Sequence, residues 1–61
     1  MTEAERLKRM ALRIERLRKN AEELKELAGE SFPSVERNAA RILASVRMLE
    51  LAVTDIVDLV K

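Results

Sequence analysis

Four arginines near the start of the chain are the residues whose type and spacing best suit binding chemistry. They recur at intervals of three, four and three residues, as Arg6, Arg9, Arg13 and Arg16. In an α-helix this spacing draws one line along one edge, about 15 Å long at 1.5 Å per residue. Guanidinium groups match the geometry of phosphates and carboxylates, so the row suits an anionic surface.

Three interpretations of this arginine edge stay open. The arginines are solvated or meet acidic residues of another subunit, they bind the phosphate backbone of a nucleic acid, or they bind an acidic protein partner. The net charge is +1, and the chain has one Phe and no Trp or Tyr. This composition argues against base stacking and against strong non-specific attraction to nucleic acid, but it is compatible with recognition of a duplex by its shape.

The sequence offers little for catalysis or metal binding. It has no His or Cys and a single Gly, so it lacks the usual bases and nucleophiles and any Gly-rich phosphate loop. Asp55 and Asp58 share a helical face, but a hard cation needs more oxygen ligands than these two residues supply. We therefore expect no enzymatic activity, no cofactor and no metal site.

An apolar stripe defines the helices that position the arginines. In the second half its members are spaced by four and three residues, the pattern of one helical face: Val35, Ala39, Ile42, Val46, Leu49, Val53, Ile56 and Val60. Reflection about a point between Ser31 and Phe32 sends the first seven of these positions to seven apolar residues: Ala28, Leu24, Ala21, Leu17, Ile14, Met10 and Leu7. Two mirrored stripes predict a helix folded back on a second helix, in which Ile14 faces Leu49 and Leu17 faces Val46.

We therefore predict an all-α fold, an antiparallel helical hairpin that forms one domain over residues 1–61. The first helix is expected at about 2–28, the turn at about 29–32 and the second helix at about 33–60. Thr2 is the expected cap of the first helix, with Glu5 at capping-box spacing. Gly29 is the expected stop, because the residue after a helix often needs a backbone conformation that glycine adopts with least strain.

The second helix should begin near Pro33, which suits a first helical turn. This favours Ser31 as its cap, with Ser34 as the alternative. We expect the lone aromatic residue, Phe32, to act as an apolar plug over the end of a bundle.

The second helix has a wider apolar arc than one partner helix can cover. Small chains without disulfides or metals commonly complete their core by association. We therefore predict a homo-oligomer, with a homodimeric four-helix bundle favoured and the second helix at its interface. The predicted interface residues are Ala4, Ala11, Leu43, Val57 and Leu59. Glu50 lies beside the stripe and should pair with Arg18 or with an arginine of another subunit.

In length, in the mirrored stripes from Leu7 to Val60, in the bend from Gly29 to Pro33 and in its charged fraction of 38%, the chain resembles a known group. This group is the short, Cys-free helical-hairpin proteins encoded by viruses that infect hot-spring archaea. The resemblance implies a dimeric bundle that acts as an adaptor.

We expect a small interaction, adaptor or structural module that self-associates through the second helix. The alternative is an RNA- or DNA-binding regulator that uses the arginine edge, and a third reading is an antitoxin-like subunit that completes its bundle with a different protein. Residues 1–20 contain no apolar run of the length that a signal peptide needs. Charged residues within 42–60 would make a membrane span costly, so we expect a cytoplasmic protein that does not enter a membrane.

Overall fold

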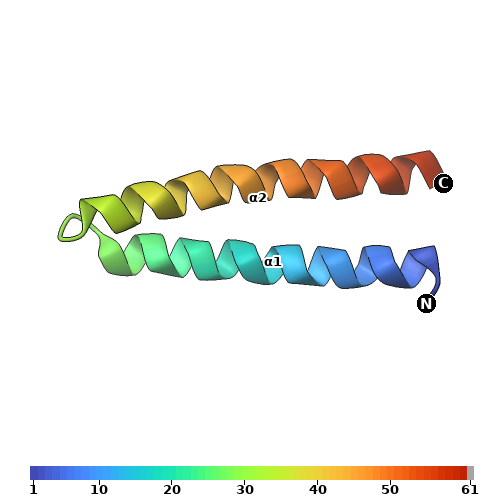
Figure 1. The fold of residues 1–61 in the computed structure, drawn as a ribbon, viewed down its shortest axis with the longest axis horizontal. Coiled ribbons are helices and arrows are strands. Elements are labelled where there is room, and N and C mark those ends of the chain that lie inside the picture. Colours follow the sequence, from blue (N-terminus) through green and yellow to red (C-terminus); the bar gives the residue numbers. More distant parts are fainter. Residues whose placement is uncertain (61) are drawn as a thin grey trace.

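The protein is an all-α antiparallel hairpin of two packed helices, as the mirrored stripes predict. The computed structural model describes the backbone of residues 1–60 and the side chains of residues 1–57. Helix α1 spans Glu3–Ala28 and helix α2 spans Pro33–Val60. The helices lie side by side over their whole length (Figure 1), and the molecule measures 45 × 18 × 11 Å. No helix in the described part of the chain is long and apolar enough to cross a membrane.

The two ends of α1 are set by the residues that the sequence indicates. The Thr2 side chain accepts a hydrogen bond from the Glu5 backbone N–H at 3.1 Å, which satisfies one of the free donors of the first turn. At the other end Gly29 has a φ of 51° and donates its N–H to the Lys25 carbonyl at 3.1 Å. A side chain would strain the backbone at this φ, so glycine is suited to turning the chain out of the helix.

Helix α2 begins at Pro33, as predicted, but its cap residue differs from the prediction. Because the helix begins at Pro33, the residue at the cap position is Phe32 and neither Ser31 nor Ser34. The Phe32 carbonyl accepts the Glu36 N–H at 3.0 Å. Its ring is 61% exposed, so within a single hairpin it does not cover the end of the core.

The buried residues form one row at intervals of seven along each helix. They are Ile14, Ala21 and Ala28 from α1, and Ala39 and Val46 from α2, each no more than 8% exposed. A spacing of seven corresponds to two helical turns, so each row stays on the line where the helices touch. Three of these five residues are alanines, and no large side chain in the described part of the chain is fully buried. The hairpin alone therefore has a thin core.

The dimensions of the hairpin also distinguish it from a compact monomer. Its accessible surface is 5222 Å², whereas a folded monomer of 7.0 kDa is expected to expose about 4,000 Å². Its radius of gyration is 14.2 Å, against about 10.5 Å for a compact chain of this length. The chain thus exposes about 1,200 Å² more than its mass requires.

Candidate interaction surface

Seven large apolar side chains lie on one side of the hairpin and are half exposed, between 42% and 48%. We call this set the open face; it consists of Met10, Leu17, Leu24, Val35, Ile42, Leu49 and Ile56. On both helices these residues alternate with the buried row at spacings of three and four. Because three residues turn a helix by about 300°, both sets are displaced from the line of contact toward the same side of the antiparallel pair.

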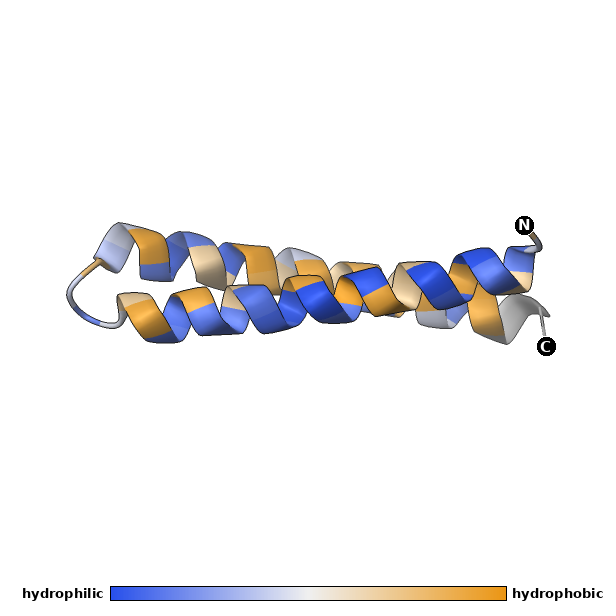
Figure 2. Cartoon of the chain, turned by 90° about the horizontal axis from the view of Figure 1, so that it is seen from below, coloured by the Kyte–Doolittle hydropathy of each residue, from blue (hydrophilic) through white to orange (hydrophobic). Residues whose placement is uncertain are grey.

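A shallow hollow in the open face shows this arrangement directly. Met10 and Ile14 line it from α1, and Leu49, Val53 and Ile56 line it from α2. Hydrophobic and hydrophilic bands alternate along both helices (Figure 2), so the apolar groups follow the helices rather than gathering in one spot. The hollow confirms that apolar side chains from both helices share one surface.

On each helix, the single apolar stripe inferred from the sequence is therefore divided into two rows, one buried and one on the open face. Ile14 is buried, but Leu49, its expected partner, is 44% exposed. Likewise Val46 is buried, whereas Leu17 is 48% exposed. The physical reason is that two cylinders touch along one line, so a second helix covers only one of the two rows in a stripe with 3,4 spacing.

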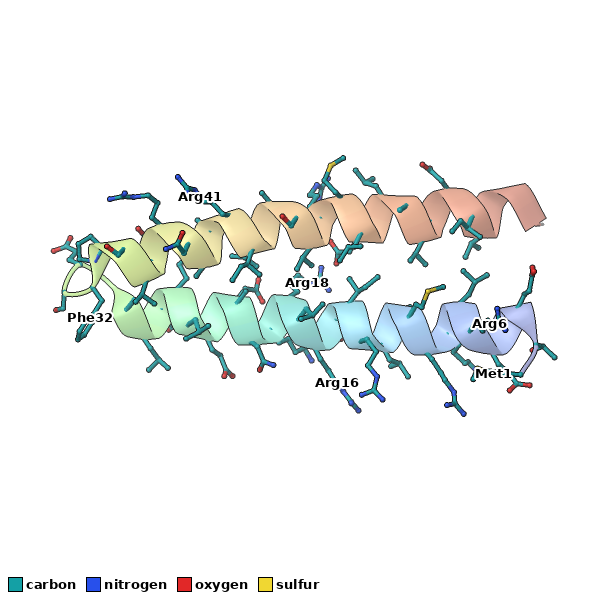
Figure 3. The ribbon with its side chains drawn as sticks, in the orientation of Figure 1. Met1, Arg6, Arg16, Arg18, Phe32 and Arg41 are labelled. Atoms are coloured by element: carbon teal, nitrogen blue, oxygen red, sulfur yellow. The ribbon has the colours of Figure 1, made fainter. Side chains whose placement is uncertain are left out.

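The other side of the hairpin carries an ion pair between the two helices. Arg18 Nη1 lies 2.6 Å from Glu50 Oε2, and the Arg18 side chain extends toward α2 in Figure 3. This confirms the predicted pairing of Glu50 with Arg18. Both side chains are partly exposed, so the pair contributes only about 0.2 to 1 kcal/mol. The pair nevertheless gives this second side of the hairpin polar character. We call the side that carries Arg18 and Glu50 the ion-pair side.

Among the side chains that the structure describes, none of the predicted interface residues belongs to the open face. Leu43 is half-buried in a hollow bordered by Glu22, Lys25 and Glu36, and Val57 is also half-buried. Ala11 is exposed, and the hollow that it lines on the ion-pair side also contains Arg18 and Glu50.

Of the remaining two, Ala4 is exposed, and the side chain of Leu59 lies outside the described residues. A role for any of the five in an oligomer stays a prediction, which the single hairpin does not test.

The arginine edge borders the open face. Arg9 and Arg13 line the same hollow as Leu49 and Ile56, and Arg6 lies with Met10 at its outer end. Arg9, Arg13 and Arg16 also line a hollow with Leu12, and Arg16 points away from α2 (Figure 3). All four arginines are exposed.

Among the side chains that the structure describes, ion pairs join Arg18 to Glu50 and Lys19 to Glu15. None of the four edge arginines takes part in either pair. Their charge is therefore left to solvent or to a second molecule.

Acidic groups form no metal site in the described part of the chain. No three metal-ligating side chains converge there. Asp55 is exposed, and the side chain of Asp58, its neighbour at a spacing of three, lies outside the described residues.

Comparison with known protein families, with curated proteins and with solved structures finds no match to this chain. Its class rests on its own geometry, which is a two-helix antiparallel hairpin. The feature of that geometry that suggests a function is the open face bordered by arginines.

Proposed function

We propose that this chain is a small helical interaction module that self-associates through its open face into a homodimeric four-helix bundle, as a structural or adaptor element. The observation that carries the proposal is the open face, whose seven apolar side chains are each about half exposed on one side of the hairpin. Each of these residues leaves about half of its surface in solvent. A second helical layer would bury that surface, as in four-helix bundles.

The area of the hairpin supports a second copy as the partner. Its excess over a compact monomer, about 1,200 Å², is enough for an interface of standard size, which buries about 800 Å² on each partner. The open face has apolar residues along both helices, so two such faces complement each other without any other protein. This self-complementarity is the property that a twofold interface needs.

Two neighbouring leucines of α2 provide a matched test. Leu49 on the open face is 44% exposed and Leu51 on the outer side is 47% exposed. Glutamate at either position costs a lone hairpin a similar amount, but only Leu49→Glu places a charge in the centre of the proposed interface. We expect Leu49→Glu to raise the dimer dissociation constant at least about a hundredfold, and Leu51→Glu to leave it nearly unchanged.

Light scattering and sedimentation of the purified chain at micromolar concentration measure the outcome. A folded monomer for the unmodified chain would refute the proposal. Equal dimerisation of the two variants would show that the open face is not the interface. Dissociation by Leu43→Glu with no effect of Leu49→Glu would assign the interface to the ion-pair side instead.

A second function is favoured by one observation, the absence of ion pairs at the arginine edge among the described side chains. In this reading Arg6, Arg9, Arg13 and Arg16 hold the phosphate backbone of duplex RNA or DNA. Loss of the arginine charges would then abolish binding without affecting the bundle. We rank this function second because the chain lacks an aromatic platform for bases and has a net charge of only +1.

A further inference from the structure

The arginine edge distinguishes the two ways in which a twofold axis can stack two open faces. An axis across the hairpin places α1 on α1 of the partner subunit, with the two bends at opposite ends. An axis along the hairpin places α1 on α2 of the partner subunit, with both bends at the same end. In both arrangements neighbouring helices run antiparallel, so apolar packing alone does not choose between them.

The arrangement with bends at opposite ends brings the two Arg16 side chains together at its centre. Its axis passes at the level of Leu17, which is midway between Met10 and Leu24. Met10 of one subunit then meets Leu24 of the other, and Leu17 meets its own copy. Arg16 then lies one residue from the level of the axis and therefore two residues, about 3 Å along the bundle, from the level of Arg16 of the partner subunit. The two arginine edges then lie along a single side of the bundle, where the two Arg16 cations repel each other. Arg9 meets an opposite charge there, because it lies within two residues of the level of Glu23 of the partner subunit.

The arrangement with bends at the same end separates these charges. Residues of α1 and α2 whose numbers add to about 63 lie at the same level in the hairpin, as the shared hollow of Met10, Ile14, Leu49 and Val53 shows. An axis along the hairpin keeps these levels, so Arg9 lies level with Asp55 of the partner subunit. Glu23 likewise lies level with Arg41 of the partner subunit, and no cations of the two edges face each other.

The bend offers a second and independent indication. Leu27 is 80% exposed and Phe32 is 61% exposed, and both lie at this end of the hairpin; the Phe32 ring lies on the outer side of the bend in Figure 3. With both bends at one end, the apolar groups of the two subunits gather there and can shield one another from water.

From the charges and the bend we infer, on the basis of the proposed dimer, that two copies associate about an axis along the hairpin. Both bends lie at one end, and the arginine edge of each subunit faces the rim of α2 that carries Asp55 of the partner subunit. This orientation deepens the proposed function, because it uses the arginine edge within the dimer and keeps the two edges on opposite sides of the bundle.

Distance measurement between spin labels tests the orientation. The chain has no Cys, so Ser31→Cys introduces a single labelling site, and Ser31 is exposed in the bend. With bends at one end, the labels are separated by about two interhelical spacings, below about 25 Å including the label linkers. With bends at opposite ends, the separation approaches the 45 Å length of the hairpin.

Lys19→Cys is the matched control, because Lys19 is exposed and close to mid-hairpin. Labels there lie at nearly the same level in either orientation and therefore report dimerisation alone. Dilution with unlabelled chain should remove both distances if they arise between subunits. A short Ser31 distance supports the inference. A long Ser31 distance alongside a Lys19 distance overturns the orientation but leaves the dimer, whereas loss of any intermolecular distance at Lys19 overturns both proposals.

Discussion

Replacement of Leu17 by alanine gives the most direct energetic measure of what covers the open face. In the hairpin Leu17 is 48% exposed and Leu12, on the outer side of the same helix, is 53% exposed. For an isolated hairpin both substitutions remove a half-exposed side chain, so each should cost roughly 1 kcal/mol of unfolding free energy. Alanine has the higher helix propensity, which offsets a small part of either loss.

Dimerisation should make the effects of the two substitutions differ. In the proposed bundle Leu17 becomes fully buried, so Leu17→Ala should destabilise by about 2 to 5 kcal/mol per subunit, the range for leucine in a packed core. Leu12→Ala should stay within about 1 kcal/mol, because no second layer covers the outer side. Each dimer contains two copies of the substitution, so the dimer loses about 4 to 10 kcal/mol for Leu17.

Urea unfolding of both variants at several protein concentrations measures this difference. A dimer that unfolds to two chains has a midpoint that rises with concentration, and the fitted free energy then includes association. The reasoning is refuted if Leu12→Ala and Leu17→Ala have equal effects, because equal effects would mean that the open face stays in solvent.

Two further changes test the bend and the arginine edge. Gly29→Ala should destabilise by about 1 to 2 kcal/mol per subunit through backbone strain at φ 51°. Steric overlap adds nothing, because an added Cβ would meet only the Glu26 carbonyl at 3.8 Å. An unchanged urea midpoint would show that the bend relaxes freely. The double variant Arg9→Gln, Arg13→Gln should weaken the dimer by up to about 1 kcal/mol per lost pair. The unmodified chain should bind no duplex RNA or DNA even at low salt. Saturable binding of a nucleic-acid hairpin at physiological salt that these substitutions abolish, with melting unaltered, would favour the nucleic-acid function instead.

The hairpin and its local signals could be predicted from the sequence because they depend on short-range chemistry. Thr2 and Gly29 act through hydrogen bonds and backbone angles within one turn of their own position. The Arg18 and Glu50 pairing was one of two options that the position of Glu50 beside the apolar stripe indicated, and the structure selects it.

The division of the apolar stripe was beyond such reasoning. Leu17 and Ile14 are both apolar members of one face, and spacing does not say which of them meets the second helix and which faces a further layer. That choice depends on how the two helices rotate about their axes, which is set by packing along the whole contact. The cap of α2 was also misplaced, because the chain enters that helix at Pro33 directly after Phe32 without a polar side chain at the cap position.

The position of the chain ends relative to the bend determines how the hairpin responds to a pulling force. Met1 and Val60 lie at the same end of the antiparallel pair (Figure 1). A force that separates these ends therefore peels the helices apart like a zipper and does not slide them past each other. It meets the buried row one layer at a time, Ile14 before Ala21 and finally Ala28 next to the bend. Each layer resists only with its own few contacts, so a single hairpin should open at low force. A second copy packed along its length would have to be removed layer by layer in the same order.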